Sequence, residues 1–343
     1  PQGRIDERTT MVSRRTLQPG TARYAENYAQ HPGHKPKDDA FRKLPGLLSP
    51  RAALYEPLAF QAAEAHFDLI ERMRPWADGE PAPQAAPLAP GALARRLKAL
   101  AQANGAHSVG ITKLRPYHLY SYRGRGSQYG EAVANTHRFA LALTVEMDHK
   151  AVGKAPAAPT VEESARQYVR SGVIALELAL FLRNLGYPAR AHIDGEYEVV
   201  CPLVARDAGL GEIGRMGLLM TPRLGPRIRI AVVTTDAPLV PDTYRPDNSV
   251  TDFCRICKLC AQACPSRAIP FGSKRLINGA LRWQINQEAC FTYWCRVGTD
   301  CARCMDICPY SHPNTPLHQI VRYGIRNTAS FRYLALKMEA WLY

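Results

Sequence analysis

The sequence lacks any uncharged apolar run that approaches the roughly eighteen residues needed to span a bilayer. Its most apolar stretch, residues 173–182, is short and contains Glu177, so we predict a core helix there. No repeat is visible apart from paired cysteine motifs. With 343 residues, 46% of them apolar and 22% charged, the chain has the composition of a globular protein with two or three packed units.

The chain also lacks a long run of basic residues, although its formal net charge is +14. Lysine and arginine are scattered and not interleaved with aromatic residues, which argues against nucleic acid as a partner. Residues 13–17 (SRRTL) have a faint likeness to a twin-arginine export signal, but residues 18–23 are not apolar. We therefore expect Arg14 and Arg15 to be ordinary surface residues.

Helical and strand patterns alternate over residues 91–245 without a regular strand–helix–strand period, which predicts an α+β core. We expect helices at 54–73 and 91–104 and one from a capping box at 160–163 to residue 185. Strands are expected at 108–112, 139–147 and 229–235, with a hairpin joining 189–193 to 197–200. The predicted units are an N-terminal extension with a proline-rich linker (1–90), the core (91–245), a cysteine-rich domain (246–325) and a C-terminal helix (326–343).

Nine of the ten cysteines lie between positions 254 and 308. The spacing C-x2-C-x2-C-x3-C-P is that of bacterial ferredoxins, in which the fourth cysteine of each motif binds the other 4Fe–4S cluster. This crossing rule assigns one cluster to Cys254, Cys257, Cys260 and Cys308. The other takes Cys264, Cys301, Cys304 and either Cys290 or Cys295.

Other uses of these cysteines fit less well. A disulfide framework suits a small secreted domain. Zinc favours C-x2-C pairs a dozen or more residues apart and gives no reason for two C-x3-C-P endings. A domain with two 4Fe–4S clusters is therefore the prediction.

Residues 209–214 (GLGEIG) match the G-x-G-x-x-G pattern of dinucleotide sites, but their context does not. No buried strand precedes them, and glycines and prolines interrupt the segment that follows. We interpret Gly209 and Gly211 as part of a loop whose backbone can approach a large flat ligand.

Several stretches, in this order, resemble the corrinoid-dependent reductive dehalogenases: residues 181–189 (FLRNLGYPA), 208–215 (AGLGEIGR), 221–229 (TPRLGPRIR) and 235–239 (TDAPL). The second cysteine motif, with Tyr293-Trp294 after Cys290, is also similar. The resemblance covers roughly residues 91–320. It implies a nitroreductase-like core that binds cobalamin, beside a ferredoxin-like domain whose two clusters supply its electrons.

The resemblance also implies roles for single residues. Tyr168 matches a tyrosine that protonates the dehalogenated carbon, with Arg227 as the first candidate for the cation that stabilises its phenolate and Arg215 as the second. Ser164, one helical turn earlier, is expected to face the same pocket, and Trp294 matches a pocket aromatic. The alternative for Tyr168 is a core aromatic, and for Trp294 a side chain that shields a cluster from water.

Family members place a cluster ligand directly before the aromatic pair, so the resemblance favours Cys290 over Cys295. Cys295 is then an extra thiol, and Cys201 is expected to be a small buried side chain.

The resulting hypothesis is an oxidoreductase that replaces halogen by hydrogen in an organohalide, using Co(I) cobalamin and two 4Fe–4S clusters. Its alternatives are an epoxyqueuosine-reductase-like enzyme acting on tRNA and a plain electron-transfer protein. The hypothesis requires an external electron donor: a ferredoxin, a flavodoxin or a reductase. The expected location is the cytoplasm. Export with a removed leader, and association with a membrane-anchor partner, is the alternative.

Overall fold

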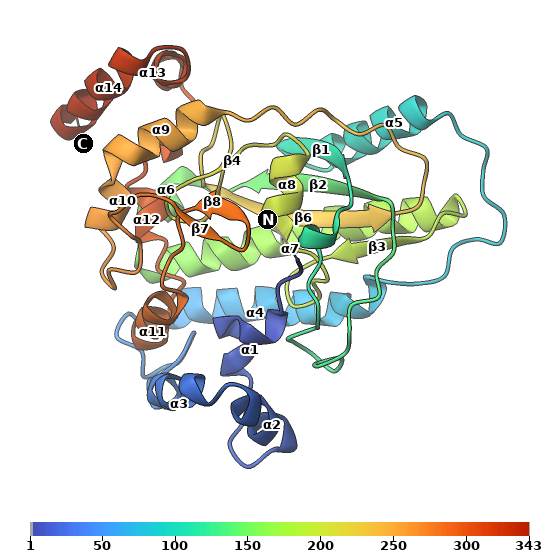
Figure 1. Ribbon diagram of the computed structural model, residues 1–343, viewed down its shortest axis with the longest axis horizontal. Coiled ribbons are helices and arrows are strands. Elements are labelled where there is room, and N and C mark those ends of the chain that lie inside the picture. Colours follow the sequence, from blue (N-terminus) through green and yellow to red (C-terminus); the bar gives the residue numbers. More distant parts are fainter. Residues whose placement is uncertain (1–2, 343) are drawn as a thin grey trace.

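A four-stranded antiparallel sheet lies at the centre of the computed structural model, which describes residues 3–342 (Figure 1). Its strand order is β1-β2-β6-β3. The strands are β1 (Ser108–Lys113), β2 (Phe139–Glu146), β3 (Ala189–His192) and β6 (Ile228–Thr235). All four lie where the sequence predicts strands, and the α+β class is confirmed.

Both faces of this sheet are covered, which explains why β2 is apolar at almost every position. Leu141 and Leu143 belong to one core cluster, together with side chains of the long helix α7 (Ala158–Asn184). Ala140 and Ala142 belong to the cluster on the other face, which contains α8 (Cys201–Asp207). Cys201 is buried in this second cluster, as expected.

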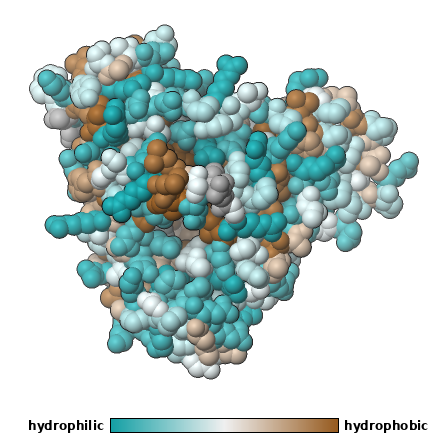
Figure 2. Space-filling view, viewed as in Figure 1, coloured by the Kyte–Doolittle hydropathy of each residue, from teal (hydrophilic) through white to brown (hydrophobic). Residues whose placement is uncertain are grey.

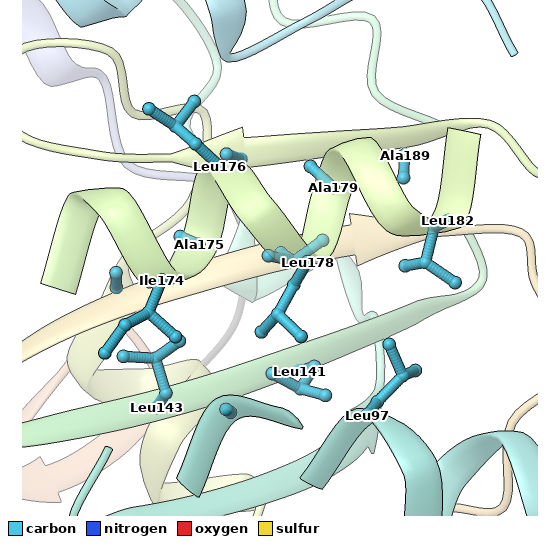
Figure 3. Packing of buried hydrophobic residues seen from close by; sticks show 14 of the residues in the cluster. Leu97, Leu141, Leu143, Ile174, Ala175, Leu176, Leu178, Ala179, Leu182 and Ala189 are labelled. Atoms are coloured by element: carbon cyan, nitrogen blue, oxygen red, sulfur yellow. The ribbon is translucent and has the colours of Figure 1, made fainter. Parts of the chain in front are cut away.

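Helix α7 packs on the sheet; α4 (Pro57–Met73) packs along α7, and α5 (Pro90–Ala103) contacts both α7 and β1. Figure 3 shows Ile174, Leu178 and Leu182 of α7 directed toward the strands, with Leu97 of α5 beside them. These three helices confirm the predicted ones. Helix α4 lies before the boundary predicted at residue 90 yet packs along α7, so the first 90 residues contribute to this core.

Two local predictions are wrong. Helix α7 begins at Ala158 rather than at a capping box, and the Thr160 hydroxyl inside its first turn donates to the Ala151 carbonyl. Residues 197–200 form no strand, because the partner of β3 is β6. The Asp194-Gly195 turn therefore ends the sheet instead of joining two of its strands.

The cysteine-rich segment folds into short elements: α9 (Asn248–Cys257), α10 (Leu259–Gln262), β7 (Arg275–Ile277), β8 (Ala280–Arg282), α11 (Gln287–Val297), α12 (Arg303–Asp306) and η5 (Pro309–Ser311). Two helices follow, α13 (Pro316–Asn327) and α14 (Ala329–Leu342), and they pack on each other and on α9. The C-terminal helix expected at 326–343 is therefore α14, with α13 preceding it.

The N-terminal segment packs against α11 of the cysteine-rich segment. It contains η1 (Glu7–Thr9), α1 (Met11–Arg15), α2 (Ala22–Gln30), η2 (Pro32–His34) and α3 (Lys35–Arg42). Arg14 is 1% exposed and is held by ion pairs with Asp38 and Glu288, so its prediction as a surface residue is wrong. Arg15 is exposed, as predicted.

The remaining elements are η3 (Arg74–Trp76), η4 (Pro116–His118), α6 (His149–Val152), β4 (Glu212–Ile213) and β5 (Leu219–Met220). Within residues 3–342, every helix is too short or too polar to cross a bilayer.

Candidate functional site: two thiol groups and a cavity

The first thiol group consists of Cys254, Cys257, Cys260 and Cys308, which come together from α9, α10 and the loop after α12. Burial raises the pKa of the Cys308 thiol well above its ordinary value, and the other three thiols of the group raise it further. Such mutual repulsion between would-be thiolates requires them to be near neighbours. A positively charged iron centre would remove it.

The second thiol group consists of Cys264, Cys290, Cys301 and Cys304. Burial raises the pKa of Cys290 to about 12, and Cys264 and Cys301 contribute to that rise. Cys304 interacts with all three of its group and also with Cys260, so the two groups adjoin. The structure therefore brings together the eight cysteines that the crossing rule and the resemblance select, in the predicted sets of four.

Cys295 lies apart from both groups. Its side chain is 2% exposed and packs with Met11, Phe41 and Phe291. Burial raises the pKa of its thiol, and the one charged neighbour that affects it is Arg15. Nothing in this environment resembles the thiol-rich surroundings of Cys290.

The backbone around both groups is tightly turned. Lys258, Cys301 and Ala302 all have positive φ angles, of 59°, 61° and 50°. Such left-handed residues let consecutive N–H groups point toward an anionic centre. Among residues 3–342 no three His, Cys, Asp or Glu side chains converge closely enough for a single metal ion.

A cavity of about 340 Å³ opens beside the second thiol group. Its wall includes all four thiols of that group and is largely apolar, with Met216, Leu218 and Ile285 among its residues. Tyr168 of α7 and Arg229 of β6 also border it, together with Asp300 and Trp294. The cavity therefore lies between the sheet domain and the cysteine-rich segment.

Tyr168 faces a cation in this cavity. The guanidinium carbon of Arg229 lies 4.9 Å from the centre of the Tyr168 ring. Burial raises the pKa of Tyr168, and the positive charge of Arg229 opposes that rise. A phenol in this position can give up a proton while the adjacent cation stabilises the phenolate.

Arg229 is itself fixed by two partners. One of its terminal nitrogens lies 2.5 Å from Ser164 Oγ and 2.9 Å from Asp300 Oδ2. Ser164 also donates to the same carboxylate oxygen. The prediction that Ser164 faces the same pocket as Tyr168 agrees with this geometry. Asp300 Oδ1 and Arg229 Nε are buried without hydrogen-bond partners, so two polar atoms remain for a bound molecule.

The structure does not bring Arg227 to Tyr168. Its side chain is 1% exposed and donates to the carbonyls of Ser311 and Met147 and to Glu146. Arg227 therefore joins the sheet to the loop after the last cysteine. Arg229 and Asp300 are not among the site residues predicted from the sequence. The available signals were a charge inside an otherwise apolar strand and an acid directly before Cys301.

Arg215 lies beside the first thiol group and does not line the cavity. It donates to the carbonyl oxygens of Cys254, Pro270 and Gly272 at 2.9, 2.6 and 3.0 Å. Burial lowers the pKa of Arg215, and the neighbouring thiols of the first group oppose that change. Arg215 therefore does not contact Tyr168, but it is placed to affect a cluster.

Gly209 and Gly211 also lie outside the cavity. Gly209 has a φ of +80° and follows the end of α8. A side chain on Gly211 would come within 2.2 Å of the Met220 carbonyl oxygen. Close packing of β4 on β5, not a flat ligand, accounts for this glycine.

Trp294 does border the cavity, on α11. It also forms a hydrogen bond with Cys290 that lowers the pKa of that thiol, against the larger effect of burial. Both predicted roles of Trp294, as a pocket aromatic and as a cover for a cluster, are compatible with this position.

Comparison with known proteins agrees with this arrangement. The 4Fe-4S dicluster domain family matches residues 253–312. The tetrachloroethene reductive dehalogenase of Sulfurospirillum multivorans is 35% identical over 215 residues, which are 60% of this chain and 42% of that protein. This chain thus spans less than half the length of that relative.

Two solved structures are similar over most of the chain. The catabolic reductive dehalogenase NpRdhA in complex with 3-bromo-4-hydroxybenzoic acid has a TM-score of 0.78 and 28% identity. The match covers 99% of this chain and 48% of that one. A reductive dehalogenase structure described with a mechanism for B12-dependent dehalogenation has a TM-score of 0.77 and 28% identity over 89% of this chain and 43% of that one.

Proposed function

Because this chain belongs to the reductive dehalogenase family, we propose that it replaces halogen by hydrogen in an organohalide, with cobalamin and two 4Fe–4S clusters as cofactors. The observation that carries the proposal is the single cavity that joins the second thiol group to Tyr168 and Arg229. Electrons and a proton can therefore reach the same space.

The eight thiols of the two groups are the proposed cluster ligands. Cys304 interacts with Cys260 of the first group, so the two clusters would be neighbours. The second would face the cavity, since its four thiols line the wall. Electrons are expected to pass from the first cluster to the second and then to the cavity.

The cavity fits a corrinoid in the chemistry of its wall. Apolar side chains suit the flat ring, and Asp300 Oδ1 and Arg229 Nε are unpaired polar atoms for its edge. When bound, a corrinoid supplies a strongly reducing metal that can cleave a carbon–halogen bond. Among the predicted cofactor-binding residues, Ser164 and Trp294 stay candidates, whereas Gly209, Gly211 and Arg215 lie elsewhere.

Tyr168 is the proposed proton donor to carbon. Arg229, held by Ser164 and Asp300, would stabilise the phenolate that remains. The predicted pair of Tyr168 and Arg227 is thus replaced by Tyr168 and Arg229. The balanced reaction consumes two electrons and one proton and releases halide.

The test is anaerobic reconstitution with iron, sulfide and hydroxocobalamin, followed by measurement of halide released from a bromophenol or a chloroethene. We expect retention of cobalt by the folded, cluster-loaded protein and release of halide. Failure of such protein to retain corrinoid would refute the proposal. The tRNA-directed alternative predicts tRNA binding with a steep salt dependence.

A further inference from the structure

We propose that the β7–β8 hairpin and the adjacent part of α9 form the docking surface for an acidic protein that carries one electron at a time. This inference rests on the proposed function, which needs an external reductant. It concerns the surface beside the first thiol group on which the hairpin lies.

The segment from Phe253 to Gln287 contains no aspartate or glutamate. It contains six basic residues: Arg255, Lys258, Arg267, Lys274, Arg275 and Arg282. Within the described part of the chain, none of these six forms an ion pair with a carboxylate, in contrast to Arg14 and Arg229. Their positive charge is therefore uncompensated by the protein itself.

Two like charges face each other across the strands of the hairpin. Arg275 of β7 and Arg282 of β8 are direct cross-strand partners. Like charges in that arrangement are destabilising, because the two side chains stand on the same face of the ribbon. A negatively charged partner would relieve this repulsion.

The neighbouring pair in the register is apolar. Leu276 and Leu281 are also direct partners, and they are 76% and 65% exposed. Because side chains alternate along a strand, they stand on the face of the ribbon opposite to Arg275 and Arg282. Figure 2 shows hydrophobic side chains gathered at the position that the hairpin occupies in Figure 1, with hydrophilic residues around them. Lys274, two residues before Leu276, is on the leucine face, so this face joins an apolar pair to a positive charge, and the two arginines add charge from the other face. Apolar contact with charge at its rim is typical of a protein–protein interface. Nucleic-acid platforms instead use aromatic side chains, so the paired leucines favour a protein.

The hairpin is connected to the first thiol group through Arg215 and Trp283. The Arg215 guanidinium lies 4.5 Å from the Trp283 ring centre and donates to the Cys254 carbonyl. Lys274 lies 5.0 Å from the same ring, and its charge reaches the Cys254 thiol. A carrier on the hairpin would therefore sit beside the first cluster.

The proposed step is transfer of one electron. The carrier's reduced centre loses the electron, the first cluster gains it, and the second cluster then accepts it from the first. Two such encounters supply the two electrons that removal of one halide requires.

The test uses cluster-loaded protein and a reduced acidic flavodoxin as the carrier, with the rate of cluster reduction followed by stopped-flow absorbance. Arg275→Glu places an acid opposite Arg282, so it should not weaken the hairpin. We expect it to lower the rate at least about tenfold at low salt and to flatten the salt dependence, because the steering charge is reversed. Leu276→Ser/Leu281→Ser should also slow the reaction, without flattening the salt dependence.

The matched control is Arg95→Glu on α5, an exposed position whose substitution changes the net charge equally. It should leave the carrier rate within about twofold, and small chemical reductants should reduce every variant equally. Equal carrier rates for Arg275→Glu and Arg95→Glu would refute the docking surface. The docking surface would also be refuted if Arg275→Glu abolished binding of RNA or anionic vesicles but left the carrier rate unchanged.

The two proposals fail separately. If a chemical reductant drives halide release but the hairpin substitutions do not change the carrier rate, the docking surface is refuted and the dehalogenase function stands. If the hairpin substitutions change the carrier rate but the protein releases no halide, the dehalogenase function is refuted and the docking surface stands.

Discussion

The two thiol groups have similar sequence motifs but different surroundings. The first packs among the buried side chains of Phe253, Trp283 and Tyr310, beneath a basic hairpin. The second forms one wall of a cavity that also contains Tyr168 and Arg229. Two motifs that share a C-x2-C-x3-C-P ending therefore lead to one shielded site and one that faces the proposed reaction space. The difference arises because Tyr168 and Arg229 border the cavity that the second group lines, whereas Arg215 and Met220 pack directly against the first group.

The comparison gives the two groups different roles. The first is placed to receive electrons, and the second to deliver them to the cavity. Substitutions beside one thiol group should therefore leave the other group unchanged.

The largest effect is expected from Cys290→Ser, which removes one proposed ligand of the second cluster. One of the two clusters should be lost together with nearly all turnover, as measured by EPR spin counts and iron content. Cys295→Ser is the matched control, since Cys295 packs with Met11 and Phe41 and should leave both clusters intact. The reverse pattern would overturn the choice of Cys290.

Tyr168→Phe is expected to retain both clusters and the corrinoid but to lower kcat by about 10²- to 10⁴-fold, the usual contribution of a positioned acid. Because burial raises the pKa of Tyr168, the phenol stays protonated at neutral and mildly alkaline pH. Wild-type kcat should therefore fall only as the pH rises through that raised pKa. Unchanged turnover in Tyr168→Phe would exclude this residue from the mechanism.

The substitutions Arg229→Gln and Arg227→Gln distinguish the roles of the two arginines. Arg229→Gln should lower kcat about tenfold or more, because the Tyr168 phenolate loses its cation. Arg227→Gln should instead lower the free energy of unfolding by about 3 kcal/mol, because buried partners lose their donors. Its kcat per folded molecule should change little. Thermal denaturation and turnover of both variants check this, and a larger loss of kcat in Arg227→Gln would restore the original prediction.

The smallest effect is expected from Arg215→Gln, which removes a positive charge beside the first thiol group. The oxidised form of that cluster should be favoured, so its reduction potential should become more negative. Arg215→Lys keeps the charge and should shift the potential less. EPR-monitored redox titration should show the second cluster unchanged in both variants. An equal shift of both clusters would contradict the separation of the groups.

Much of the site was accessible from local sequence. The cysteine spacing indicated two clusters because C-x2-C-x2-C-x3-C-P is the motif of two-cluster bacterial ferredoxins. Ser164 and Tyr168 were predicted to share a face because residues four apart on a helix do so. Arg227 and Arg215 were the predicted partners of Tyr168, and the charge of Arg229 inside an apolar strand was the local signal for the residue that the structure places there. The capping box failed because α7 begins two residues earlier, and Arg14 was misjudged because its partners Asp38 and Glu288 lie far along the chain.

The sequence by itself determined the cluster domain and the main strands and helices, since these depend on spacing within short segments, whereas Tyr168 as proton-donor candidate came from the family resemblance. Tertiary structure decided which arginine serves Tyr168. The register pairs Arg229 with Val145, which belongs to the core cluster that contains α7, and so directs Arg229 toward that helix. Pairing between strands more than eighty residues apart is set by packing of the whole sheet, which no local pattern encodes.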